Sequence, residues 1–147
     1  MTLDKTDKAI IGHLQDDGRM PFSALGPAVG LSPAAVRQRV LHLIDSGQMQ
    51  IVAVTDPKAV GFMVQALAGV TVVGSIDAAA AELAAIEEVD YVAIVTGRFD
   101  IMVEVVVEDT GRLLSLMNQI RSIDEVGALE VFNFLRLEKQ TYNWGIR

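Results

Sequence analysis

The stretch Gly30-Leu31-Ser32-Pro33 constrains the fold most, because it holds the signals that end one helix and begin another. Glycine is favoured in the left-handed conformation that closes the carboxyl end of a helix. The Ser32 hydroxyl can cap the next helix, and Pro33 suits its first position, where no amide hydrogen bond is needed. The turn therefore predicts a helix over Pro33–Ser46.

Two helical patterns precede this turn. Ile10, Ile11 and Leu14 form an apolar stripe within Asp4–Asp17, which Gly18 ends. A shorter pattern over residues 24–29 predicts a second helix, which Pro27 should kink or shorten. Three helices in this order, with the turn before the third, are typical of a helix-turn-helix. We therefore expect residues 4–56 to bind double-stranded DNA at a promoter or operator.

The third helix has an apolar face and a polar face. Val36, Val40, Leu43 and Ile44 recur at helical spacing and should face the core. The outward positions combine small side chains, which allow close approach to a groove, with longer ones that offer donors to bases or phosphates. The alternative is a solvated surface helix with Arg39 in a local salt bridge. We assign the DNA contacts to Ser32, Ala34, Ala35, Arg37, Gln38, Arg39 and His42.

The segment Met49–Val54 is apolar and β-prone, and Asp56-Pro57 ends it. It predicts a strand, either the wing of a winged-type helix-turn-helix or a linker strand that pairs with a partner subunit. Proline and glycine then interrupt the apolar pattern up to Gly61. We place the domain boundary here, with residues 1–60 as the helix-turn-helix domain and linker strand and residues 61–147 as a second domain.

The second half alternates strand and helix patterns. Strands are expected at residues 64–73, 91–95, 101–107 and 128–137, and helices at 78–86 and 110–122. The order βαββαβ is that of a ferredoxin-like sandwich, which makes the whole chain α+β. The strand Ile101–Val107 is apolar at both parities except at Glu104. A strand buried on both faces needs a second layer, so we expect at least a homodimer.

Composition excludes several kinds of function. The chain has no cysteine and two histidines, so we expect no metal site, no cofactor and no catalytic residues. It holds no apolar run of eighteen residues and no leader pattern, so we expect a soluble cytoplasmic protein that does not enter a membrane. The net charge of the chain is −7. Residues 1–58 hold six basic and six acidic residues, so residues 59–147 carry the whole net charge. This asymmetry predicts two domains with different partners.

The segment Thr96–Asp100 joins the two central strands. Gly97 allows a positive-φ turn, and Asp100 can hydrogen-bond nearby backbone. Exposed amides in such a turn can hold a carboxylate. An ordinary hairpin turn is the alternative.

The order of these motifs resembles the Lrp/AsnC, or feast/famine, family of transcription regulators. The resemblance rests on Leu3-Asp4-x-x-Asp7, Val29-Gly30-Leu31-Ser32, Arg39-Val40-x-x-Leu43 and Thr96-Gly97-x-Phe99-Asp100, among others, and covers nearly the whole chain. It implies dimers that assemble into octamers or similar rings, and an amino acid or related metabolite bound at an interface. The effector site carried over comprises Thr96, Gly97, Arg98, Phe99, Asp100, Asp109, Thr110 and, as a ligand contact or a satisfied interface group, Asn133.

Arg98 departs from the family pattern, and a guanidinium there would favour a ligand with an additional acidic group or point to solvent. Two other function classes stay open beside an amino-acid-responsive regulator. One is a nucleoid-structuring or weakly DNA-binding metabolite sensor. The other is an enzyme like the tetrapyrrole decarboxylases, which share the architecture and use histidine and arginine. Only His13 and His42 are available, both on helices of the DNA-binding half.

Overall fold

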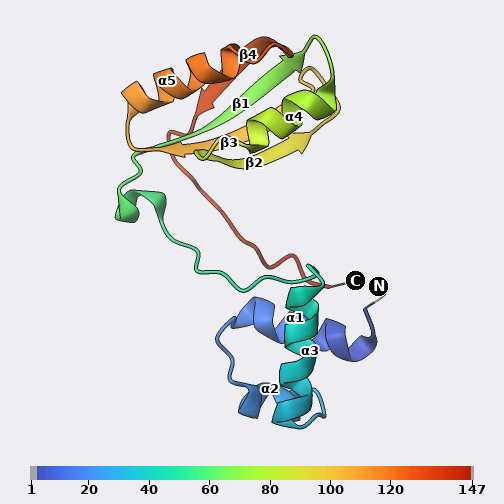
Figure 1. Ribbon diagram of the computed structural model, residues 1–147. Helices are drawn as coiled ribbons and strands as arrows, with labels where there is room; N and C mark the ends of the chain where they lie inside the picture. The colour runs from blue at the N-terminus through green and yellow to red at the C-terminus, as the bar shows by residue number, and fades with distance from the viewer. Residues whose placement is uncertain (1–2, 147) are drawn as a thin grey trace. The chain divides into compact units, whose positions relative to one another are not determined.

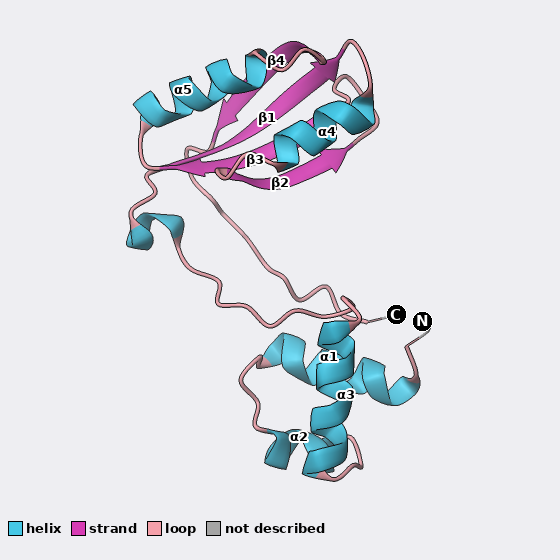
Figure 2. Ribbon diagram, viewed as in Figure 1, coloured by secondary structure: helices cyan, strands magenta, loops and turns pink. Residues whose placement is uncertain are grey.

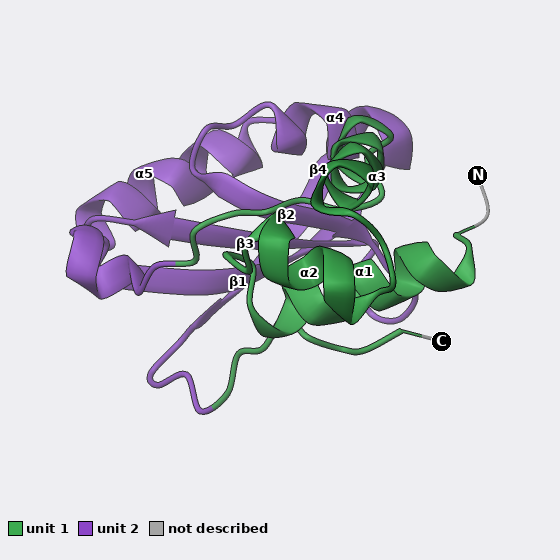
Figure 3. Cartoon of the chain, turned by 90° about the horizontal axis from the view of Figure 1, so that it is seen from below, with its two compact units in different colours: residues 1–54, 139–147 green, residues 55–138 purple. Residues whose placement is uncertain are grey.

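The computed structural model describes residues 3–146 (Figure 1). The chain divides into two compact units (Figure 3). The first spans residues 1–54 and 139–147, of which 3–54 and 139–146 are described, and the second spans residues 55–138. The first unit ends at residue 54, whereas the predicted boundary lies at residue 60. The end of the chain, which was expected in the second domain, belongs to the first unit. Asn143 Nδ2 donates to Asp16 Oδ1 there, at 2.6 Å.

The first unit contains three helices, α1 (Lys5–Asp16), α2 (Phe22–Ala28) and α3 (Pro33–Asp45) (Figure 1). Asp4 and Asp7 form a capping box at the start of α1. The Ser32 hydroxyl accepts from the Ala35 amide at the start of α3, with Pro33 in the first position, as predicted. The core of the unit comprises Ile10, Leu14, Leu25, Val36, Val40 and Leu43. Ile44, expected in this core, is exposed.

Gly26 sets how closely α2 approaches the turn before α3. A Cβ at Gly26 would lie 2.8 Å from the Leu31 carbonyl oxygen and 3.1 Å from the Pro33 nitrogen. Gly30 adopts a positive φ of 74°, as its place in the turn predicts. The helix α2 begins two residues before the predicted pattern and ends at Ala28, one residue before the predicted end, with Pro27 inside it.

The strand expected over residues 49–54 is not formed. Among its described residues the first unit contains no strand, so it has no wing in the single chain, and Ile51, Val52 and Val54 are exposed. A strand requires a neighbour to satisfy its backbone groups, and a single chain supplies none here. The short 3-10 helix η1 (Pro57–Val60) follows, and Gly61 closes it in the left-handed conformation.

The second unit is a four-stranded antiparallel sheet in the order β2-β3-β1-β4. Its elements are β1 (Val64–Val72), α4 (Ile76–Ala84), β2 (Val89–Ile94), β3 (Ile101–Val107), α5 (Thr110–Arg121) and β4 (Val126–Asn133). This confirms the predicted βαββαβ order and the α+β class. The helix α4 begins two residues before the expected start, because Ser75 caps it. The strand β4 ends at Asn133 rather than at Leu137.

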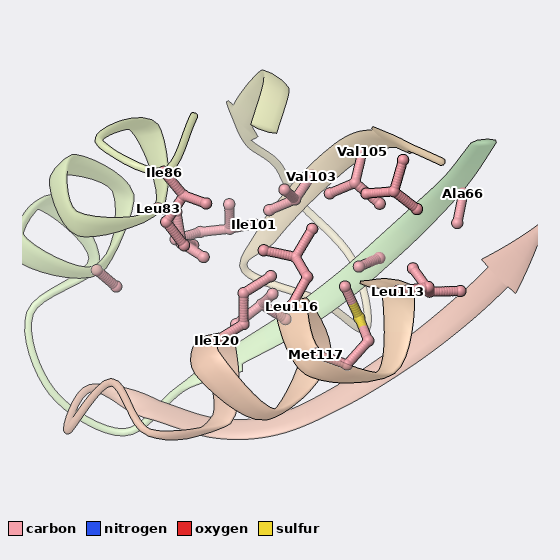
Figure 4. Close-up of a cluster of buried hydrophobic side chains, with 14 residues drawn as sticks. Ala66, Leu83, Ile86, Ile101, Val103, Val105, Leu113, Leu116, Met117 and Ile120 are labelled. Carbon is pink, nitrogen blue, oxygen red and sulfur yellow. The ribbon is translucent and has the colours of Figure 1, made fainter. Parts of the chain in front are cut away.

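Both helices cover the same face of the sheet (Figure 2). The side chains of Ile101, Val103, Val105 and Val107 alternate toward this face and are buried. They pack against Leu83 and Ile86 of the α4 region and against Leu113, Leu116, Met117 and Ile120 of α5 (Figure 4). The other face carries no helix among the described residues, and we call it the open face. Met102, Glu104 and Val106 lie half-buried on it.

Candidate DNA interface and effector site

The outward face of α3 is exposed as predicted. Val36, Val40 and Leu43 anchor the helix in the core, while Arg37, Gln38 and His42 are exposed on its other side. Ser32 and Ala34 are also exposed, and Ala35 is half-buried. Small residues at the start of the helix and longer donors one turn later leave its amino-terminal half free to approach a DNA groove.

Arg39 is used within the fold. Its Nη1 lies 2.7 Å from Asp4 Oδ2 and 2.7 Å from Asp7 Oδ1, so it ties α3 to the capping box of α1. The Asp7 backbone amide and the Arg39 guanidinium hold the pKa of Asp4 below its ordinary value. The geometry thus favours the local salt bridge for Arg39 over the DNA contact that we assigned to it.

The Thr96–Asp100 segment is a turn held by three hydrogen bonds. Gly97 has a φ of 136°, and the Val95 amide donates to the Asp100 carbonyl at 2.9 Å. The Asp100 amide donates to the Val70 carbonyl, and Asp100 Oδ2 accepts from the Val72 amide at 2.8 Å. The predicted backbone hydrogen bond of Asp100 is therefore present. One carboxylate oxygen is committed to β1, and the other, Oδ1, takes no part in that hydrogen bond.

Phe99 and Arg98 extend from this turn over the open face. The Phe99 ring lies on Gly69 of β1 and meets the ring of Phe132 edge-on, with 6.2 Å between centroids. The Arg98 guanidinium lies 4.8 Å from the Phe99 ring centroid and forms an exposed ion pair with Glu130. Sequence reasoning missed Gly69, Glu130 and Phe132. Strand parity could have grouped Glu130 with Phe132, because alternate residues of β4 share a face.

The rest of the expected effector set lies elsewhere on the unit. Asp109 follows β3 and caps α5, where its Oδ1 accepts from the Arg112 amide at 2.8 Å, and Thr110 begins that helix. Asn133 pairs with Ala66 near the other end of β1. It is exposed and lies on the helix-covered face of the sheet, as Leu129 and Val131 do. Ile101 pairs with Val70 and Val107 with Val64. Asp109, Thr110 and Asn133 therefore lie at the opposite end of the sheet from the Thr96–Asp100 turn.

A polar cluster occupies the middle of the open face. Glu104 of β3 accepts a hydrogen bond from Gln65 Nε2 at 2.5 Å. Asp90 lies at a bulge of β2, between the residues that pair with Val105 and with Glu104. Loss of hydration and the Glu104 charge raise the pKa of Asp90. Two carboxylates in this position are unfavourable on a face that is otherwise largely apolar.

In the part of the chain that is described, no three His, Cys, Asp or Glu side chains gather in a way that could hold a metal ion. Within residues 3–146, no helix is long and apolar enough to cross a membrane.

Comparison with known proteins identifies both units. Residues 3–44 match the AsnC-type helix-turn-helix domain, and residues 65–144 match the Lrp/AsnC ligand binding domain. The HTH-type transcriptional regulator FL11 of Pyrococcus horikoshii is 30% identical over 141 residues, which cover 95% of this chain and 93% of the relative.

Solved structures resemble the whole chain. The Mycobacterium tuberculosis leucine response regulatory protein (LrpA) is 31% identical with a TM-score of 0.85, covering 94% of this chain and 96% of that one. The transcriptional regulator NMB0573 of Neisseria meningitidis, in a complex with L-Met, is 29% identical with a TM-score of 0.81, covering 96% and 95%. The relatives are named as transcriptional regulators and not as enzymes, which removes the decarboxylase alternative. The chain belongs to the Lrp/AsnC family and is a transcriptional regulator with a DNA-binding helix-turn-helix domain and a ligand-binding domain.

Proposed function

We propose that the protein binds operator DNA through the exposed face of α3 and responds to an amino acid or a related small metabolite. The observation that carries the DNA part is the arrangement of α3, whose apolar side is buried while Arg37, Gln38 and His42 stay exposed. Exposed polar side chains on the outward face of such a helix can contact bases or phosphates. The proposed interface consists of Ser32, Ala34, Ala35, Arg37, Gln38 and His42.

We place the effector at the Thr96–Asp100 turn. The turn combines exposed backbone with the Asp100 carboxylate, and a free amino acid has a carboxylate and an ammonium group to match them. A complex of the Neisseria relative with L-Met supports an amino acid as the class of ligand. The exposed pair of Arg98 and Glu130 beside the turn supplies charges of both signs.

The effector set also supports an oligomer. Asp109, Thr110 and Asn133 lie at the opposite end of the sheet from the turn. A single pocket that includes both groups therefore needs more than one chain. The open face supports the same conclusion, because Met102 and Val106 lie half-buried in one chain and Tyr91 and Phe132 are exposed. We propose a homodimer through the open face, with larger rings built from dimers.

A thermal-shift screen of the amino acids tests the effector, followed by gel-shift titration of operator DNA with and without the best ligand. A ligand at one hundred times its Kd should stabilise the native state by about 2.7 kcal/mol. Failure of every amino acid to shift the melting temperature would contradict this class of effector while leaving the DNA-binding part intact.

A nucleoid-structuring or weakly specific DNA-binding sensor is the second candidate. It is favoured by the charge of the first half, where six acidic residues balance six basic ones, and by the use of Arg39 within the fold. Footprinting on the promoter next to the protein's own gene separates the two. A bounded footprint supports the operator-specific regulator, and uniform weak protection supports the sensor.

A further inference from the structure

A hollow of about 340 Å³ lies in the second unit, at the end of the sheet where β1 begins and β4 ends. One wall is the segment of residues 56–65, which leads into β1, and the other is the segment of residues 134–137, which follows β4. We call it the linker groove. It lies at the opposite end of the strands from the Thr96–Asp100 turn, and none of the residues that line it belongs to the effector set proposed above.

Hydrogen bonds hold the η1 turn in one wall and Phe134, the first residue of the other wall. The Phe134 amide donates to the Gln65 carbonyl and the Phe62 amide to the Pro57 carbonyl, each at 2.9 Å. Asp56 Oδ1 accepts from the Lys58 amide at 3.0 Å, which holds the turn of η1. These anchors on each wall reduce the ordering that is needed when a ligand enters.

Much of the lining is apolar and open to solvent. Met63 is 60% exposed, Leu135 94% and Leu137 49%, and Phe134 lies beside them. Several large apolar side chains gathered around one hollow mark a binding surface more often than a solvated one. The volume is near the lower end of the range for small-molecule sites, so it fits a small organic molecule.

The charged residues of the lining favour a negatively charged ligand. Lys58 and Arg136 are its cations, and Asp56 is its one carboxylate among the residues that line the groove. Asp56 is already engaged with the Lys58 amide. Arg136 pairs with Glu138, but both side chains are highly exposed, so a competing anion can replace Glu138 at little cost.

We propose that the linker groove binds a small organic anion with an apolar body, such as a medium-chain or aryl carboxylate. The carboxylate would lie against Arg136 and Lys58, and the apolar body against Met63 and Leu137. Both walls continue directly in the chain into residues of the first unit, 1–54 on one side and 139–147 on the other. An occupant would therefore contact both connections to the DNA-binding unit. The proposal does not depend on the effector at the Thr96–Asp100 turn.

The test uses the full chain and the fluorescent probe 8-anilinonaphthalene-1-sulfonate, an aromatic anion. We expect its fluorescence to rise on binding, and octanoate to displace it at a concentration about tenfold lower than octylamine, which has the same chain length and the opposite charge. Arg136→Glu with Lys58→Glu should remove or reverse this preference. The matched control is Arg121→Glu, a charge reversal at the end of α5 and outside the groove, which should preserve it.

Three results would overturn the proposal. The first is equal displacement by octanoate and octylamine. The second is an unchanged preference in the double reversal when its melting curve shows that it is folded. The third is an absence of probe binding to the wild type together with a changed oligomeric state of Met63→Asp, which would assign the groove to a second copy of the chain. Gel-shift titration of the same variants separates these results from a failure of DNA binding.

Discussion

Phe99 lies directly on the backbone of Gly69, across the open face of the sheet. A Cβ at Gly69 would come within 2.5 Å of Phe99 Cδ2 and 2.6 Å of its Cε2, closer than carbon atoms approach one another. The same ring carries the Arg98 guanidinium and meets Phe132. The absence of a side chain at position 69 therefore allows the turn that precedes β3 to fold down onto the sheet.

Gly69→Ala should displace the Phe99 ring and destabilise the protein by about 1–3 kcal/mol, the usual cost of overpacking. Denaturant unfolding measures this loss. Gly12→Ala in α1 is the matched control, because its Cβ would meet only Ile146 Cδ1 at 3.5 Å. It should gain about 0.5–1 kcal/mol, as alanine does over glycine within a helix. The double variant Gly69→Ala with Phe99→Ala should lose less than the sum of the two single changes.

Asp100 offers a test that separates its structural and ligand-binding roles. Asp100→Asn keeps an oxygen that can accept from the Val72 amide but removes the charge, so we expect a folded protein that has lost the thermal shift given by the amino acid. Asp100→Ala also leaves that amide without its acceptor and should cost about 1–3 kcal/mol of stability. Calorimetry checks the ligand affinity of each. An unchanged affinity in Asp100→Asn would show that the carboxylate is a turn residue alone.

Local sequence signals predicted much of this structure. Gly30, Ser32 and Pro33 act on neighbouring backbone, so their roles follow from residue type and spacing. The strand Ile101–Val107 was expected to be buried on both faces, and in the single chain one face is buried and the other half-buried.

The features that were missed depend on contacts between distant residues. Nothing in the spacing shows that Gly69 lies under Phe99 or that Asn143 binds Asp16. The strand expected over residues 49–54 is wrong for the single chain, because a strand requires a pairing partner.

Arg37 and Arg39 are two residues apart on α3 and should respond differently to the same substitution. Arg37→Ala should weaken DNA binding with little change in stability, because the side chain is exposed. The loss should amount to about 1–3 kcal/mol at one base position if Arg37 contacts guanine, and be uniform across sequences with a shallower salt dependence if it contacts a phosphate. Gel-shift titration at several salt concentrations distinguishes these outcomes, and unchanged affinity would exclude Arg37 from the interface.

Arg39→Ala should lower the stability of the first unit, because it leaves Asp4 and Asp7 without their shared cation. The folded state lowers the pKa of Asp4, so this contribution is present above the ordinary value of 3.8 and disappears as the pH falls through the lowered pKa. The difference in unfolding free energy between wild type and Arg39→Ala should thus be larger at pH 7 than at pH 3. Equal differences at both values would show that the ion pair contributes nothing.

The Asp90 carboxylate should make stability depend on pH in the opposite direction to Asp4. The folded state raises the pKa of Asp90, so the ionised form is disfavoured by folding. Stability from this residue is greatest below the ordinary value of 3.8 and is lost as the pH rises through the raised pKa. Asp90→Asn removes the charge permanently, so it should stabilise the protein at pH 7 and have little effect at acid pH.

The same substitution should strengthen the proposed dimer, since a second copy on the open face would remove further water from Asp90 and Glu104. Denaturant unfolding across the pH range and sedimentation of the full chain at neutral pH measure the two effects. Glu87→Gln, at an exposed carboxylate just before β2, is the control and should change neither. If Asp90→Asn is stabilising but leaves the dimer unchanged, the two carboxylates lie outside the interface and the open face does not form the dimer contact. If Asp90→Asn is destabilising at pH 7, another group stabilises the Asp90 charge. The inference that Asp90 and Glu104 repel each other would then be wrong.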